Sequence, residues 1–246
     1  MPSSQALKIS DISVEFSGLK ALDHVSMHLN PGEILGLIGP NGSGKTTTIN
    51  AITGQVPLST GTVSAGEDTL SGLSPRKIAR LGIARSFQIV RLFNDLTVEE
   101  NVEASALAQG EGRRKARIAA QEMLAEFDLM GRADELAGNL NYGDKRRVEI
   151  ARALVAKPRF LLLDEPAAGM NEAESETLLN LLSILPKQRN LGLLIIDHDM
   201  PLIMRLSHRV HVLASGRTIA EGDVNEVRNN PAVIEAYLGS SAEVSA

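Results

Sequence analysis

The chain has 246 residues, 43% of them hydrophobic and 22% charged, which suits one large α/β domain with a packed core. Its net charge of −5 gives no indication of a nucleic-acid-binding face and argues against direct binding to an anionic membrane surface. It contains no cysteine, which excludes disulfides, thiol catalysis and cysteine-ligated metals.

Membrane and export signals are missing from this sequence. The first ten residues lack the basic start and apolar run of a signal peptide, and no stretch approaches 18 consecutive apolar residues. We therefore expect a chain that is soluble by itself and reaches a membrane only through a partner.

The first predicted elements are two antiparallel strands, 7–16 and 21–29, joined by a turn at Gly18. A short apolar strand over 33–38 leads into a glycine-rich loop, and the residues after that loop, 46–53, are predicted to be helical.

Helical and apolar segments alternate in the rest of the chain. Helical spacing is found over 75–81 and 172–185, and apolar runs typical of buried strands lie at 160–163, 193–196 and 210–213. Apolar strands that alternate with helices predict a parallel sheet covered on both faces.

The domain organisation follows from where this alternation is interrupted. From about 88 to 156 the pattern is mainly helical, which predicts a helical subdomain inserted into the sheet domain. We therefore expect a single domain over 1–239 with this insertion, followed by a disordered tail over 240–246.

Residues 39–46, with the sequence GPNGSGKT, fit the phosphate-binding pattern G-x-x-x-x-G-K-[ST] in full. The glycines let the loop curl so that backbone N–H groups point at phosphate oxygens, at the positive end of the following helix. Lys45 is expected to reach the β- and γ-phosphates, and the Thr46 hydroxyl to bind Mg²⁺. An ordinary glycine turn is the alternative, but this match also follows an apolar strand and opens a helix. The residues expected to bind nucleotide here are Gly39, Pro40, Asn41, Gly42, Ser43, Gly44, Lys45, Thr46 and Thr47.

Two further apolar strands end in polar residues. The strand at 160–163 is followed by Asp164, a candidate Mg²⁺ ligand, and Glu165, a candidate base or positioner of the attacking water. His198 follows the strand at 193–196 and is expected to contact the γ-phosphate. Seen alone, the acidic pair could cap a helix and the histidine could be structural; beside the phosphate-binding loop, the three indicate ATP hydrolysis.

The order of these motifs resembles that of the ATPase domains of ATP-binding cassette (ABC) transporters, over essentially the whole chain. The distinguishing segment is 140–154, LNYGDKRRVEIARAL, which lies where the family carries its signature, usually Leu-Ser-Gly-Gly-Gln. The resemblance implies a P-loop NTPase fold with an antiparallel β-subdomain and an inserted helical subdomain. It further implies that Gln88 contacts Mg²⁺, that Phe16 stacks on adenine, and that 167–171 contacts the opposite subunit.

Finer matches are similar to the ATPases of branched-chain amino acid importers: GIARSFQ at 82–88, LTVEENV at 96–102 and NPAVIEAYLG at 230–239. This similarity implies MgATP hydrolysis that powers uptake of branched-chain or other hydrophobic amino acids, or related small solutes. The implied partners are two membrane permease subunits, a second ATPase subunit and, indirectly, a solute-binding protein, with no nucleic acid. The implied location is the cytoplasmic face of the inner membrane. The alternatives are an exporter of the lipopolysaccharide-export type and a soluble ABC ATPase outside transport.

The signature segment departs from the family pattern at two positions. Asn141 replaces the serine that contacts the nucleotide of the other subunit, and Asp144 replaces the usual glutamine, whereas Gly143 remains. We expect Asn141, Gly143 and Asp144 to face that nucleotide, with a purely structural role for Asp144 at the helix start as the alternative. The departure motivates the hypothesis that the site completed by this segment hydrolyses ATP slowly, and that restoring serine and glutamine raises activity.

Overall fold

The computed structural model describes residues 4–86 and 89–242. A four-stranded antiparallel sheet, in the order β2-β1-β4-β5, is built from β1 (Leu7–Phe16), β2 (Leu19–Leu29), β4 (Thr60–Ala65) and β5 (Asp68–Thr69). β1 and β2 pair antiparallel across the turn at Gly18, where φ is +87°, as predicted.

A second, six-stranded sheet carries the order β10-β9-β3-β8-β7-β6, and its strands other than β10 run parallel. The parallel sheet expected from the apolar runs is therefore confirmed, whereas the antiparallel edge strand β10 and the short edge strand β6 were not predicted. The strands are β3 (Ile34–Ile38), β6 (Ile83–Arg85), β7 (Phe160–Asp164), β8 (Gly192–Ile196), β9 (Arg209–Ala214) and β10 (Arg217–Gly222).

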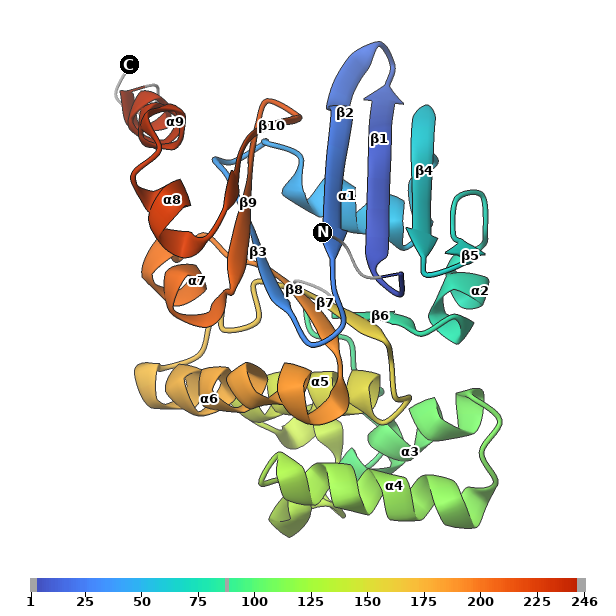
Figure 1. Ribbon diagram of the computed structural model, residues 1–246. Helices are drawn as coiled ribbons and strands as arrows, with labels where there is room; N and C mark the ends of the chain where they lie inside the picture. Colours follow the sequence, from blue (N-terminus) through green and yellow to red (C-terminus); the bar gives the residue numbers. More distant parts are fainter. Residues whose placement is uncertain (1–3, 87–88, 243–246) are drawn as a thin grey trace.

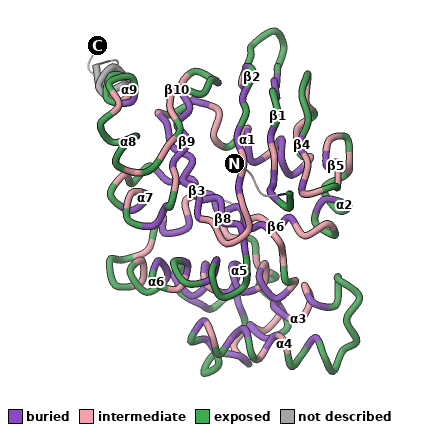
Figure 2. The backbone as a smooth tube through the Cα atoms, in the orientation of Figure 1, coloured by how far each residue is buried: buried purple, intermediate pink, exposed green. Residues whose placement is uncertain are grey.

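The strands β3, β7 and β8 of the six-stranded sheet are buried on both faces, whereas the edge strand β10 is partly exposed (Figure 2). Along β7, Leu161 and Leu163 belong to one hydrophobic core, while Phe160 and Leu162 belong to another, because successive side chains of a strand point to opposite faces. The second core also contains residues of α1 (Lys45–Ile52) and the antiparallel sheet. The first core is shared with the helices that follow the strands, and the sheet is thereby the central layer of the molecule.

Between β6 and β7 the described residues form three α-helices, α3 (Val98–Ala108), α4 (Arg113–Glu126) and α5 (Tyr142–Leu154), and two short 3-10 helices, Met130–Arg132 and Ala137–Asn139. α3 and α4 pack together at the far side of α5 from the sheet (Figure 1). α3 begins with a capping box in which Thr97 accepts from the backbone of Glu100, which explains why the helix starts there.

The other helices are α2 (Pro75–Arg80), α6 (Glu172–Arg189), α7 (Met200–Leu206), α8 (Val224–Arg228) and α9 (Pro231–Ala242). Within the described ranges, no helix is long and apolar enough to cross a membrane. α9 continues past Gly239, so residues 240–242, expected to begin a disordered tail, are helical, and 243–246 lie outside the described residues.

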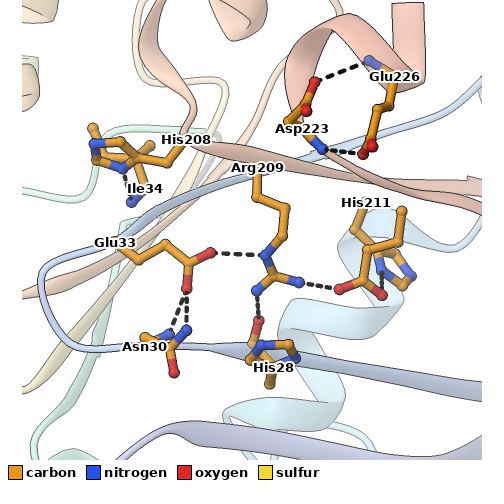
Figure 3. Close-up of polar contacts among 10 residues, drawn as sticks. His28, Asn30, Glu33, Ile34, His208, Arg209, His211, Asp223 and Glu226 are labelled. Carbon is orange, nitrogen blue, oxygen red and sulfur yellow. Dashed lines mark hydrogen bonds and ion pairs between the residues drawn. The ribbon is translucent and has the colours of Figure 1, made fainter. Parts of the chain in front are cut away.

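A polar network joins β2, β3, β9 and β10 at the end of the sheet where β3 begins (Figure 3). Arg209 donates to Glu33 Oε1 at 2.8 Å and to the backbone carbonyl of His28 at 2.5 Å, and it also pairs with Glu221. His211, which is fully buried, shares a hydrogen bond with Glu221. These contacts fasten the antiparallel edge strand to both sheets.

Candidate functional site

The glycine-rich loop connects β3 to α1 and has little room for side chains. Gly39 has a φ of +151°, and a Cβ added there would lie 2.0 Å from the carbonyl oxygen of Leu213 in β9. Gly44 has a φ of +104° and precedes the first residue of α1, where a Cβ would lie 2.7 Å from Leu22. Since an L side chain fits neither position, the glycines of the predicted phosphate-binding pattern are required by the fold.

Lys45 is curled into this loop. Its Nζ donates to the carbonyls of Gly39 at 2.7 Å and Pro40 at 2.9 Å. Burial lowers the pKa of Lys45, against the opposing influence of the Glu165 and Asp164 charges. The ammonium is thus held within the loop, near enough to the two carboxylates for their charges to act on it.

The carboxylates lie at the C-terminal end of β7. The Asp164 side chain is buried, and burial, followed by the neighbouring charge of Glu165, raises the pKa of Asp164. Glu165 has a φ of +48°, in the left-handed region that side chains other than glycine seldom occupy, and its N–H donates to the carbonyl of Ile196 at 2.8 Å. The chain therefore turns sharply between the two acidic residues.

His198 follows the neighbouring strand β8 and lies beside them. Its Nδ1 is 3.4 Å from Glu165 Oε1 and 3.7 Å from Asp197 Oδ1, and its side chain is 72% exposed. Asp197 is buried and accepts a hydrogen bond from the backbone of Asp199; burial raises the pKa of Asp197. The three predicted side chains Asp164, Glu165 and His198 thus converge at one edge of the sheet, as expected for adjacent parallel strands.

Arg146 at the same edge was not singled out from the sequence. It is fully buried, and its guanidinium donates to the backbone carbonyls of Asp164 at 2.6 Å, Glu165 at 3.1 Å and Pro166 at 3.1 Å. Its only sequence signal is Glu149 three residues later, a spacing that also occurs on exposed helix faces.

Tyr237 in α9 is a second contact that the sequence did not indicate. The backbone of Gly39 hydrogen-bonds its hydroxyl, while burial raises the pKa of Tyr237. The ring packs against the core beneath the helix. The C-terminal helix therefore contacts the start of the glycine-rich loop through Tyr237.

The signature segment forms the start of α5. Asn141 caps the helix: its Oδ1 accepts from the N–H of Asp144 at 2.8 Å, and its Nδ2 donates to Asp144 Oδ2 at 3.0 Å. The Asp144 carboxylate is buried, pairs with Arg147, and lies 3.2 Å from Nε of Arg132. The structure thus places this carboxylate in an internal arginine pocket, in line with the structural alternative for Asp144.

The remaining predicted residues are distributed as follows. Phe16 ends β1 with 48% of its surface exposed, so it is not a core residue. Thr46 is exposed, and the Ser43 hydroxyl is buried without a hydrogen-bond partner among the described residues. Gly143 is buried, and a Cβ there would lie 2.7 Å from Glu174. Gln88 lies outside the described residues.

The donor atoms at this edge fit a nucleotide-bound Mg²⁺. In the described part of the chain, no three His, Cys, Asp or Glu side chains gather to hold a metal. Mg²⁺ bound with a nucleotide needs only one or two protein oxygens besides phosphates and water. The Asp164 carboxylate and the exposed Thr46 hydroxyl are such oxygens.

Comparison with known proteins agrees with this geometry. The ABC transporter family matches residues 22–168, and the family described as branched-chain amino acid ATP-binding cassette transporter matches 217–243. LivG of Escherichia coli, a high-affinity branched-chain amino acid transport ATP-binding protein, is 41% identical over 97% of this chain and 100% of its own length. LptB of Escherichia coli, a lipopolysaccharide export system ATP-binding protein, is 34% identical over 95% of this chain and 97% of its own length.

Two solved structures are also similar. The ADP conformation of an ATP-binding cassette of an ABC transporter has a TM-score of 0.84 and 30% identity, covering 95% of this chain and 98% of the other. A dimeric bacterial ABC transporter cassette has a TM-score of 0.80 and 26% identity, covering 89% and 98%. This chain therefore belongs to the ABC transporter family, as one of its ATP-binding subunits.

Proposed function

We propose that this chain hydrolyses MgATP to power an importer of branched-chain or other hydrophobic amino acids, or related small solutes. The observation that carries the chemistry is the meeting of Lys45 with Asp164, Glu165 and His198 at one edge of the sheet. An ammonium, two carboxylates and an imidazole around a helix N-terminus suit the transfer of a phosphoryl group to water.

In this reaction a water oxygen attacks the γ-phosphorus, and the bond from that phosphorus to the β–γ bridging oxygen breaks. ADP leaves with the electron pair, and phosphate is the second product. Glu165 orients the water and accepts its proton, while His198 contacts the γ-phosphate beside it. Lys45 exchanges its two loop carbonyls for the β- and γ-phosphate oxygens.

Mg²⁺ would be held by Thr46, Asp164 and Gln88 together with phosphate oxygens. It supplies charge neutralisation on the phosphates. The adenine is proposed to stack on Phe16, whose exposed ring can cover a base without hydrogen bonds to it.

A second ATPase subunit, a paralogue or another copy of this chain, is proposed to close over the bound nucleotide. The loop at 167–171 and the signature residues Asn141 and Gly143 are the segments assigned to this contact, whereas the Asp144 carboxylate stays buried between Arg132 and Arg147. The dimeric cassette among the similar structures supports the arrangement.

The permeases are proposed to dock in a groove between the sheet domain and the helical subdomain, which we assign to about 88–156. This groove has a volume of about 290 Å³ and is lined by residues of β6, α3 and α5, including Ile83, Ser105 and Arg152. Such docking would place the chain at the cytoplasmic face of the membrane.

Import is favoured over export by two observations. The C-terminal match at 217–243 is to the branched-chain amino acid type, and identity is higher with LivG, at 41%, than with LptB, at 34%. An exporter remains the second candidate through that LptB relationship.

Co-purification from the native cell tests the proposal. A tagged chain carrying Glu165→Gln would be trapped with ATP, extracted gently from membranes, and its partners identified by mass spectrometry. Two permeases and a second ATPase are expected, with a cognate binding protein that binds leucine, isoleucine or valine. Recovery of ribosomal or DNA-associated proteins alone would contradict a transporter, and recovery of an export apparatus would contradict import.

A further inference from the structure

Arg146 makes an unusually complete set of contacts for a buried charge. No part of the residue is exposed, and a guanidinium has five N–H donors to satisfy. Three successive backbone carbonyls, those of Asp164, Glu165 and Pro166, accept from it. Its charge is balanced by Glu149, whose Oε2 lies 2.6 Å from a terminal nitrogen of Arg146.

The three carbonyls belong to the part of the chain that aims Glu165. This residue has a φ of +48°, and a non-glycine residue keeps such a conformation only where its surroundings enforce it. One constraint is the bond from its N–H to Ile196 in β8. A second is Arg146, which donates to this backbone from α5, beside the bond from the N–H of Ala168 to the Glu165 carbonyl. The direction of the Glu165 carboxylate therefore depends in part on this arginine.

Glu149 extends the contact to a third part of the chain. Its Oε1 accepts from the N–H of Arg91 at 3.3 Å, and its side chain is 2% exposed. The carbonyl of Arg91 in turn accepts from Arg152, one turn further along α5. The segment after residue 88 is thereby bound to the same helix face that holds the backbone of Glu165.

We propose that Arg146 and Glu149 form a positioning pair that sets the direction of Glu165 according to the placement of Arg91. Charge balance alone does not require these residues, since a buried ion pair can be replaced by apolar side chains of similar volume without loss of stability. Apolar side chains, however, cannot donate hydrogen bonds to the carbonyls of Asp164, Glu165 and Pro166. This positioning role rests on the proposed ATPase function. It adds that the pair joins the segment around Arg91 to the backbone of Glu165 through α5.

The double variant Arg146→Met, Glu149→Leu tests this role, because it keeps the volume and removes both charges together. Steady-state hydrolysis of MgATP by the full-length chain is expected to fall on the order of 10- to 100-fold in kcat, because Glu165 is no longer held in place. The KM for ATP is expected to change by less than about two-fold, and Tm to fall, because three backbone carbonyls lose a donor inside the protein.

A matched control is the pair Arg189 and Glu126, which joins α6 to α4. Arg189 lies in the last turn of α6, at the opposite end of that helix from Asn171. Arg189→Met with Glu126→Leu should leave kcat unchanged. Because the double variant at the site could disturb folding, Arg146→Lys is measured beside it; lysine keeps the charge opposite Glu149 but cannot span three carbonyls, and it should lower kcat at equal KM.

Two outcomes separate the possible failures. A folded Met/Leu variant with the kcat of the unchanged chain would overturn the positioning role and leave the ATPase proposal intact. An unchanged chain that binds no nucleotide and hydrolyses no ATP would instead overturn the function on which the role rests.

Discussion

His198 Nδ1 lies 3.4 Å from Glu165 Oε1, although the two residues follow different strands of the sheet. β7 and β8 are parallel neighbours, so the residues just beyond their C-terminal ends come together. The Glu165 carboxylate is therefore oriented by a neighbouring side chain as well as by its own backbone.

Replacement of Glu165 by glutamine should separate binding from hydrolysis. Glutamine has nearly the same shape but accepts no proton, so kcat is expected to fall on the order of 100-fold or more while ATP still binds. Phosphate release and nucleotide affinity measured on the same preparation check this. Glu122→Gln, which alters an exposed carboxylate of α4, should leave both unchanged; equal loss of ATP binding in Glu165→Gln would contradict the assigned role.

Replacement of Tyr237 by phenylalanine should weaken nucleotide binding without loosening α9. The ring still packs on the core, but the Gly39 backbone loses its partner, an effect of about 1 kcal/mol. We expect the Kd for ATP to rise about five-fold in titration calorimetry, with little change in Tm. Ile234→Ala, on the exposed side of the same helix, is the control. Equal affinities of Tyr237→Phe and the unchanged chain would show that the hydroxyl does not support the loop.

Replacement of Asp144 by asparagine should lower the stability of the helical region. It removes the carboxylate that Arg132 and Arg147 share inside the protein. Both arginines are partly exposed and can regain water, so we expect the free energy of unfolding to fall by about 1–3 kcal/mol, measured by urea denaturation. An unchanged midpoint would mean that the arginine pocket contributes nothing to stability.

Asn141→Ser is the cleaner test of the hypothesis that the signature segment slows one of two sites. Serine can also cap α5, so the helix should remain intact. We expect steady-state ATP hydrolysis by the assembled transporter to rise. Asp144→Gln, which would restore the usual glutamine of the signature, would confound this result because it also removes the carboxylate that pairs with Arg132 and Arg147. No rise, alongside loss of activity in Glu165→Gln, would count against asymmetry arising here.

Acid should weaken the attachment of the edge strand β10. The hydrogen bond with His211 lowers the pKa of Glu221 below its usual 4.5, with the Arg209 charge acting in the same direction. Since the folded state holds the proton more weakly than the unfolded chain, this contribution to stability is present above pH 4.5 and is lost as the pH falls through the lowered value. The free energy of unfolding should decline less steeply over this range in Glu221→Gln than in the unchanged chain or in the control Glu235→Gln.

The sequence was most informative where function depends on neighbours in the chain. The loop at 39–46 and the strand ending in Asp164 and Glu165 are continuous segments, so their chemistry could be read directly and their placement followed from the apolar runs. The order of motifs was enough to indicate the family.

Contacts between distant segments were not accessible in this way. Arg146 and Glu149 have the spacing of an exposed helical ion pair, and only the fold shows that they are buried against β7. Asp144 was expected to face a phosphate because it stands in the signature segment. Its partner Arg132 lies in a separate 3-10 turn, and no local pattern links the two residues. β6 has three residues, too few for any periodic pattern.

The position of β3 within its sheet determines how much the phosphate-binding loop can move during the ATPase cycle. All five residues of this strand are buried, and it is hydrogen-bonded to β8 on one side and β9 on the other. Amide hydrogens in such a strand exchange with solvent chiefly through global unfolding, so the phosphate-binding loop is mounted on the part of the chain that opens least often. The phosphate-binding loop is therefore expected to stay fixed relative to the core during a cycle, while other segments that contact the nucleotide move toward it.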